Sequence, residues 1–156
     1  MSRDQDLTSV DELLLRLVRS VRRPSYRRRI LEGVPSIPGT EALRVLRAVE
    51  LREQRGKLPS ISDVADDLEV EQSTASRAVN AAVERDLVVR APDADDLRRA
   101  VLRLTEAGRG ALSTATTNRM ALIEEITADW AAADLHDLAR LLELFVARYE
   151  AVEPPL

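Results

Sequence analysis

The stretch ISDVADDLEVEQSTASRAVNAAVERDLVVRAPDADDLRRAVLRLT, residues 61–105, decides the fold of this 156-residue chain. Residues 61–68 predict a helix, because Ser60 and Asp63 form a capping pair at its start and apolar residues recur at helical spacing. These apolar residues are Ile61, Val64, Ala65 and Leu68. A turn over residues 69–71 then leads into a second predicted helix, residues 72–85.

The second predicted helix has two distinct faces. At 100° per residue, one face carries Ala75, Ala78, Val79 and Ala82. The opposite face carries Ser73, Ser76, Arg77 and Asn80. Short hydrogen-bonding side chains beside one arginine suit a surface that meets phosphates and base edges. The alternative is the ordinary solvated face of an amphipathic helix.

Residues 87–104 predict a β-hairpin. Residues 87–90 are mostly apolar and β-branched, residues 91–96 are acidic and typical of a turn, and residues 98–104 alternate with period two. This alternation predicts two faces of the second strand. Ala100, Leu102 and Leu104 are expected to face the helices, and Arg99, Val101 and Arg103 to face outward. Two short helices followed by a basic hairpin indicate a winged helix-turn-helix.

Four pieces of this stretch resemble the MarR family of bacterial transcription regulators. They are Ser73–Arg77, Glu84–Val88, Asp96–Arg98 and Leu102–Gly108, which are similar to the family patterns S-T-x-S-R, E-R-G-L-V, D-x-R and L-x-L-T-x-x-G. The spacing between the pieces is also kept. The resemblance extends over residues 7–152, with the specific motifs confined to residues 60–108.

The resemblance implies a set of DNA-binding residues. Ser73, Thr74, Ser76 and Arg77 would lie on a recognition helix in the major groove, and Arg98, oriented by Asp96, would reach the minor groove. To these we add Asn80 from the polar face and Arg99 from the wing.

The chain departs from the family pattern at two places. Asp86 stands where the family has glycine, and aspartate tolerates the left-handed conformation better than most residues. Glu71 and Gln72 replace serine and proline at the start of the recognition helix. This change puts a carboxylate near the expected position of a phosphate.

The flanking segments predict further helices. Ser9 and Glu12 indicate a capping box, and the apolar stripe that follows should kink or end at Pro24. Residues 36–38 are expected to open a second helix that stops near Gly56. Thr105 is expected to cap a long helix that reaches Trp130. Its inward side would carry Leu112, Ile123 and Ile126, and a last helix would start at Asp134.

These segments predict three parts of the chain. Residues 1–33 would form an N-terminal dimerisation helix, residues 36–108 a winged helix-turn-helix lobe, and residues 109–156 C-terminal dimerisation helices. The first and last helices have apolar stripes that are not contiguous with the winged stretch. We therefore expect a mainly α fold with a small β-hairpin wing and a helical bundle that forms a homodimer.

Composition excludes several classes of protein. The chain has no cysteine, so disulfides and thiol sensors are excluded. It has no long apolar run, and its N-terminus is polar. These features predict a cytoplasmic protein without a membrane segment. The net charge is −4, but the acids of the winged stretch lie mainly on its first helix and in the wing turn, so local patches decide whether DNA is attracted.

The remaining chemistry is sparse. His136 lies near two aspartates, and the turn 93–96 lacks the glycine and glutamate of a calcium loop, so we predict no catalytic or metal site and no cofactor. Arg22, Arg23 and Arg27, with Tyr26 among them, have several interpretations. They form a solvated face, contact phosphates, or bind an anionic effector of the small aromatic type that the family resemblance implies.

Together these observations predict a DNA-binding regulator rather than an enzyme. We expect a homodimeric repressor that binds double-stranded DNA at a pseudo-palindromic operator and is released by a small anionic or phenolic ligand. The rival interpretation is a winged-helix protein-interaction module that does not read DNA sequence.

Overall fold

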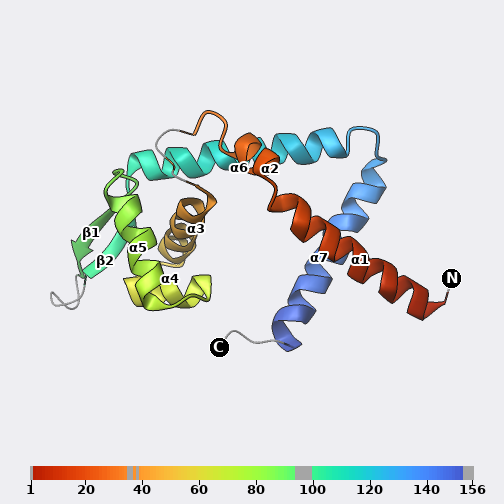
Figure 1. Ribbon diagram of the computed structural model, residues 1–156, viewed down its shortest axis with the longest axis horizontal. Helices are drawn as coiled ribbons and strands as arrows, with labels where there is room; N and C mark the ends of the chain where they lie inside the picture. The colour runs from red at the N-terminus through yellow and green to blue at the C-terminus, as the bar shows by residue number, and fades with distance from the viewer. Residues whose placement is uncertain (1, 35–36, 38, 94–99, 153–156) are drawn as a thin grey trace.

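The computed structural model describes residues 2–34, 37, 39–93 and 100–152. Within these residues the chain forms α1 (Arg3–Val21), α2 (Pro24–Ile30), α3 (Thr40–Gln54), α4 (Ile61–Leu68), α5 (Gln72–Val83), β1 (Val88–Pro92), β2 (Ala100–Leu104), α6 (Glu106–Ile126) and α7 (Ala132–Val152). Figure 1 shows a lobe of α3, α4, α5 and the hairpin under one end of α6, with α1 and α7 below its other end. The mainly helical winged fold is therefore confirmed.

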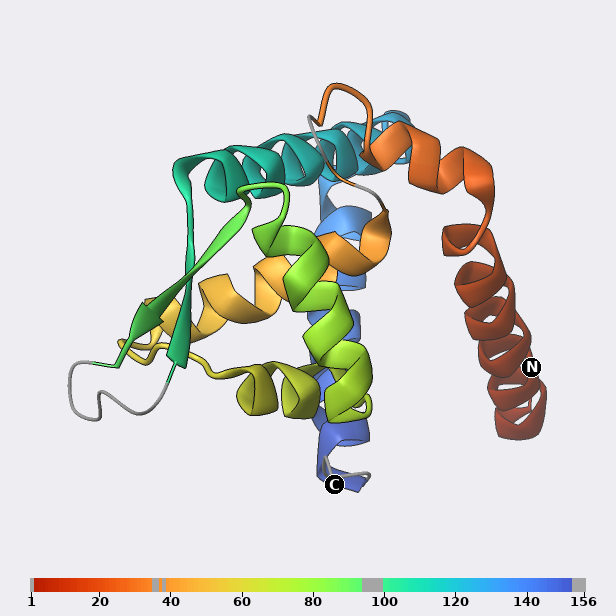
Figure 2. The same cartoon turned by 60° about the vertical axis from the view of Figure 1, so that its left-hand side comes forward.

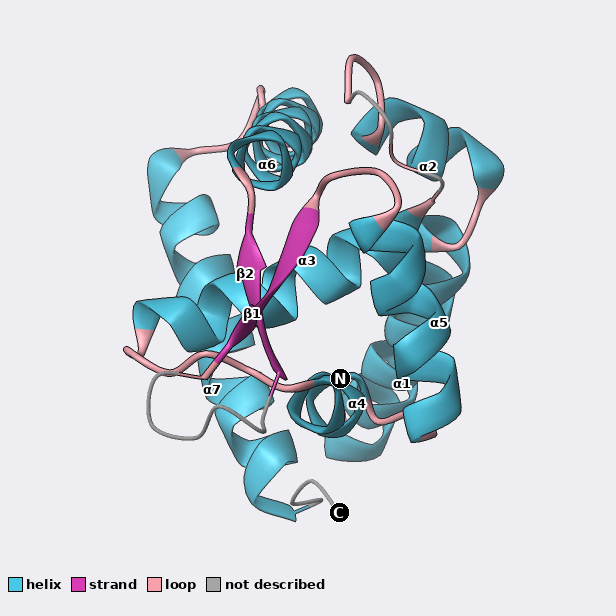
Figure 3. Ribbon diagram, turned by 90° about the vertical axis from the view of Figure 1, so that its left-hand side faces the viewer, coloured by secondary structure: helices cyan, strands magenta, loops and turns pink. Residues whose placement is uncertain are grey.

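The lobe has a single core built around α3. Leu46 and Val49 of α3, Val64 of α4, Val79 of α5 and Leu102 of β2 are all fully buried in it. The strands β1 and β2 pair antiparallel, and the hairpin lies beside α3 with α6 running past its base (Figure 3). This packing fixes the position of α5 relative to the wing.

Three short-range signals in the sequence are confirmed. Ser60 and Asp63 form the capping box of α4, and the Thr105 side chain caps α6 by accepting from Gly108 N–H at 3.0 Å. Asp86 has φ +56°, which is the left-handed conformation expected at the glycine position of the motif. Each signal involves residues within four positions of one another.

Several predicted helix boundaries are wrong. The first helix is capped by Ser2 and not by Ser9, because Ser2 and Gln5 complete a capping box earlier in the chain. Pro24 ends α1 as predicted, but it also opens the separate helix α2, since the first helical position does not require an N–H donor. The helix expected from residues 36–38 begins at Thr40 after Gly39.

The C-terminal helices also differ from the prediction. Helix α6 ends at Ile126, with Thr127 as its C-cap, and does not reach Trp130. Helix α7 starts at Ala132 and not at Asp134. Leu112 is buried as expected, but Ile123 and Ile126 are 54% and 60% exposed, because α6 runs past the lobe before it ends.

The predicted faces of β2 are partly wrong. Leu102 and Leu104 are buried and Arg103 is exposed, as expected, but Val101 is also fully buried and Ala100 is exposed. The prediction assumed a strand with one open face. In the structure Leu102 N–H donates to the Pro59 carbonyl at 2.7 Å, so β2 lies between β1 and the segment that leads to α4. The middle of β2 is therefore enclosed.

Helix α2, which the sequence analysis did not separate from α1, is attached to α6. Asn118 of α6 donates its amide to the carbonyls of Ile30 and Glu32 at 3.0 and 2.8 Å, which satisfies the C-terminal end of α2. Arg29 forms an exposed ion pair with Glu125 of α6. The hydrogen bond to Glu125 raises the pKa of Arg29, and the same bond lowers the pKa of Glu125.

Helices α1 and α7 leave large apolar surfaces uncovered within one chain. Neither helix has a buried residue, and Figure 2 shows them standing apart from each other. The exposed apolar residues on α7 include Leu138, Leu142 and Phe145, which lie one and two turns apart on one face. No described helix has the length and apolar character needed to cross a membrane.

Candidate nucleic-acid interface

Helix α5 presents the polar face that the sequence predicts. Ser73, Thr74, Arg77 and Asn80 are exposed and Ser76 is partly exposed. The opposite face packs into the lobe through Ala75, Val79 and Ala82, all fully buried. Burial of one face on the core therefore leaves the other directed to solvent, which is the requirement for a helix that enters a groove.

The start of α5 combines an arginine with an N-terminus that has no side-chain cap. Arg77 donates to the Thr74 hydroxyl at 3.3 Å, which holds its guanidinium along the helix surface. Glu71 is the N-cap residue but makes no side-chain capping bond, so its carboxylate does not satisfy the first N–H groups. A helix N-terminus of this kind is a ready position for a phosphate.

The wing is described only up to its turn. Asp96, Arg98 and Arg99, the wing residues predicted to bind DNA, lie outside the described residues. Two other arginines of the hairpin, Arg90 on β1 and Arg103 on β2, are exposed. Arg90 donates a hydrogen bond to the Asn80 amide oxygen, which joins the wing to the exposed face of α5.

Two acids of α4 form ion pairs with one arginine of α3. Arg52 donates to both carboxylate oxygens of Asp67 at 2.7 and 2.9 Å and to Asp63 at 2.9 Å. The hydrogen bond to Asp67 raises the pKa of Arg52, against a smaller effect of desolvation. Of the four acids at this helix, Asp63, Asp66, Asp67 and Glu69, the first and third are thus paired on the side of α3.

The base of the wing is tied to both α3 and α6. Glu53 of α3 accepts from Leu104 N–H of β2 at 3.0 Å and from Arg109 of α6 at 2.6 Å. Arg109 also donates to the Leu104 carbonyl at 2.9 Å. Hydrogen bonds therefore join α6 to the hairpin in addition to the chain connection.

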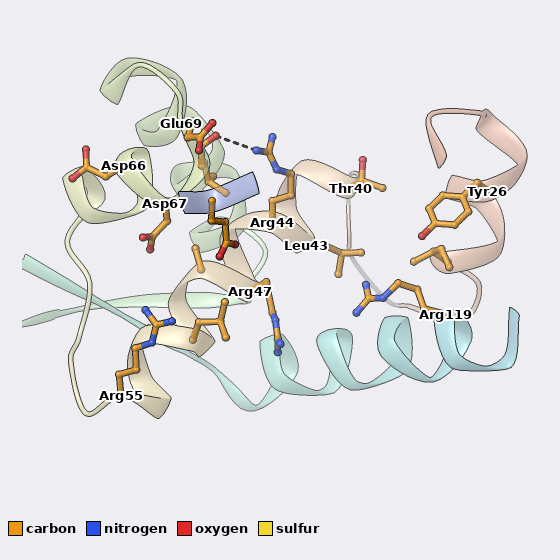
Figure 4. A pocket seen from close by; sticks show the side chains of 15 residues that line it. Tyr26, Thr40, Leu43, Arg44, Arg47, Arg55, Asp66, Asp67, Glu69 and Arg119 are labelled. Atoms are coloured by element: carbon orange, nitrogen blue, oxygen red, sulfur yellow. Dashed lines mark hydrogen bonds between the residues drawn. The ribbon is translucent and has the colours of Figure 1, made fainter. Parts of the chain in front are cut away.

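A cavity of about 970 Å³ runs along the outer side of α3 (Figure 4). Residues from α2, α3, α4, α6 and α7 line it, and its charged groups have both signs. The arginines that line the cavity are Arg44, Arg47, Arg55 and Arg119. Figure 4 shows Tyr26 and Arg119 at the same end of the cavity, whereas Asp66 and Asp67 lie at the other end.

Only one of the four predicted effector residues lines this cavity. Tyr26 does so, while Arg22, Arg23 and Arg27 are exposed and are not among its lining residues. Arg27 instead lies against Gly39, where an added Cβ would be 2.8 Å from the guanidinium. These arginines are close to Tyr26 in the sequence, but they do not line the cavity with it.

Sequence reasoning missed the residues that connect elements. Arg52, Glu53 and Asn118 give no local signal, because their partners are far away in the sequence. The contact of Arg90 with α5, in contrast, could have been anticipated from the sequence. The period of a strand places it on the same face as the buried Val88, one step nearer the wing turn, and that face packs toward α5.

The comparisons with known proteins agree with this geometry. Residues 36–99 match the family model described as MarR family. A comparison with curated proteins gives no match.

The fold is similar to solved structures over nearly the whole chain. A MarR family protein from Bacillus stearothermophilus is 16% identical with a TM-score of 0.76, covering 96% of this chain and 99% of that chain. RV1404 from Mycobacterium tuberculosis is 24% identical with a TM-score of 0.72, covering 94% of each chain. The transcriptional regulator BldR from Sulfolobus solfataricus is 20% identical with a TM-score of 0.68, covering 95% and 99%. These likenesses establish the fold.

The matched segment contains α3, α4, α5 and β1, which are the elements that carry the exposed polar face and the first strand of the wing. That family consists of DNA-binding regulators and not of enzymes. Residues 36–99 of the chain therefore match the MarR family of winged-helix transcriptional regulators, and the chain as a whole has the fold of a solved MarR family protein.

Proposed function

We propose that this protein is a cytoplasmic homodimeric repressor that binds a pseudo-palindromic operator. The observation that carries the proposal is the exposed polar face of α5, held outward by the buried residues of the same helix. Ser73, Thr74, Ser76, Arg77 and Asn80 would contact the major groove. Asp96, Arg98 and Arg99 would act at the wing.

The homodimer is supported by the uncovered apolar helices. Residues 1–33 and 109–156 would form the dimerisation region, and residues 36–108 the DNA-binding lobe. In a two-fold dimer the two α5 helices would occupy successive major grooves, about 34 Å apart. Apolar faces as extensive as those of α1 and α7 are expected to be buried against a second copy.

The DNA contacts can be tested by two substitutions. Arg77→Ala should weaken operator binding by about 1–3 kcal/mol and relax the preference at one base pair per half-site. Arg98→Ala should weaken binding to most sequences and reduce the salt slope by about one unit, as expected for a phosphate or minor-groove contact. The measurement is fluorescence anisotropy with operator and scrambled duplexes at several salt concentrations.

Unchanged operator affinity in both variants would contradict the assignment of α5 and the wing to DNA. If the affinity of the unmutated chain for duplex DNA depends on neither the salt concentration nor the DNA sequence, a protein-interaction module is favoured instead.

We also propose that a small anionic aromatic ligand controls DNA binding from the cavity along α3. Tyr26 and Arg119 at one end of this cavity suit an aromatic ring with a carboxylate or phenolate group. The cavity borders α3, α4 and α6, so an occupant would change how the lobe sits relative to the dimerisation helices. A differential affinity of about 1–3 kcal/mol between the two arrangements is enough to lower operator affinity.

The effector proposal predicts release of the operator by simple aromatic acids. Benzoate-type and salicylate-type compounds are titrated against the protein–operator complex, and the ligand concentration at half release is measured. Arg119→Ala or Tyr26→Ala should raise that concentration about tenfold, because each removes a direct contact. A variant in which Arg22, Arg23 and Arg27 are all replaced tests the effector site that the sequence predicted. No release by any compound would indicate a regulator that binds DNA constitutively.

A further inference from the structure

Among the described residues, a hydrogen bond between two exposed side chains joins the wing to the recognition helix α5. Arg90 of β1 donates from its guanidinium to the amide oxygen of Asn80 on α5. Asn80 lies on the same face of the helix as Ser73, Ser76 and Arg77. The contact therefore lies on the surface that carries the proposed DNA interface.

The backbone places Arg90 where it reaches Asn80. After α5, Leu87 N–H donates to the Ala82 carbonyl at 2.9 Å, and β1 runs from this point toward the wing turn. Val88 packs into the core, and Arg90 lies on the same face of the strand. Because strand pairing with Leu102 fixes the backbone of Arg90, the side chain is presented to α5 from a rigid element.

The chemistry of the pair fixes the orientation of the amide. A guanidinium has only donors, so the group of Asn80 that faces Arg90 must be the oxygen. The NH2 group of Asn80 is then directed away from Arg90, where it offers donors and no acceptor. A free asparagine, by contrast, presents its oxygen and nitrogen side by side, the arrangement that pairs with N6 and N7 of adenine.

We propose that Arg90 is a positioning residue that makes Asn80 a hydrogen-bond donor toward DNA, so that Asn80 selects guanine rather than adenine at one operator position. In the major groove guanine presents two acceptors, N7 and O6, whereas adenine presents one acceptor and one donor. An amide whose oxygen is held toward the wing offers its NH2 hydrogens to the two acceptors of guanine, whereas the two-point adenine contact requires the oxygen and the nitrogen to face the base together. This inference rests on the proposed function, because it requires α5 in the major groove.

The test compares base preference in three variants. Arg90→Met removes the donors of Arg90 while keeping a long side chain, and Asn80→Ala removes the amide. Arg103→Met is the matched control, because Arg103 is also exposed on the hairpin and its loss changes the charge equally. Each protein is titrated with duplexes in which every half-site position carries each of the four bases, at one salt concentration.

We expect the unmutated protein to favour guanine over adenine about tenfold at one position and Asn80→Ala to lose that preference. Arg90→Met should shift the preference at the same position toward adenine, because the released amide is able to turn. Arg103→Met should weaken all duplexes alike and leave the preference intact.

Two results would overturn the inference while leaving the proposed function in place. One is a uniform loss in Arg90→Met, like that of the control. The other is a uniform loss in Asn80→Ala, which would indicate a phosphate contact. Failure of the unmutated chain to bind any duplex would overturn both the inference and the proposed function.

Discussion

Replacing Leu142 with glutamate is expected to convert the protein from a dimer to a monomer. Leu142 lies on the apolar face of α7 with Leu138 and Phe145, and it is exposed within one chain. In a two-fold dimer the substitution occurs twice, so two leucine side chains lose their burial and two carboxylates are brought into an apolar interface. The loss should be about 4–6 kcal/mol, or on the order of a thousandfold or more in the dissociation constant.

Analytical ultracentrifugation at micromolar concentration measures this effect against the chain mass of 17.4 kDa. Ala147→Glu is the matched control, because it introduces the same side chain five residues further along α7 and about 140° around the helix axis, away from the apolar face. The control should remain a dimer. Operator affinity should fall with dimerisation in Leu142→Glu, since one lobe alone contacts a single half-site. A monomeric unmutated chain would contradict the dimer itself.

Replacing Gly108 with alanine is expected to destabilise the lobe strongly. Gly108 is buried in the first turn of α6, and an added Cβ would be 2.1 Å from the carbonyl oxygen of Leu87. That carbonyl already accepts from Thr105 N–H, and the Thr105 hydroxyl donates to the Asp86 carbonyl at 2.6 Å. The methyl group therefore meets backbone that is held in place, and relief requires α6 to move away from the turn.

The expected cost is about 3 kcal/mol, the upper end of the range for overpacking. Gly110→Ala provides the control, because Gly110 lies in the same helix with no atom within 4 Å of an added Cβ. That variant should gain about 0.5–1 kcal/mol from the better helix propensity of alanine. Denaturant unfolding followed by circular dichroism, at one protein concentration, distinguishes the two. Equal stability of both variants would mean that the contact between α6 and the turn is looser than the structure indicates.

The sequence by itself determined the secondary structure of the winged helix-turn-helix, because the signals in that stretch are local. The capping pair of α4, the two faces of α5, the left-handed Asp86 and the capping Thr105 depend on residues no more than a few positions apart. The family resemblance rests on this same stretch. The fold class and the exposed polar face of α5 were therefore predictable. Helix boundaries outside the stretch were less so, because Ser2 and Ser9 both begin reasonable capping boxes.

Only the tertiary structure decided how the elements are joined. Arg52 reaches across to α4, Glu53 to the wing base, Asn118 to α2, and Arg90 to Asn80. Such contacts depend on the packing of distant segments. Many exposed arginines have a similar local sequence, so the sequence does not show which of them forms a long-range contact. For the same reason Tyr26 lines the cavity while its neighbouring arginines do not. Packing also enclosed Val101, which the period of the strand placed outside, because burial depends on every segment that lies against a strand.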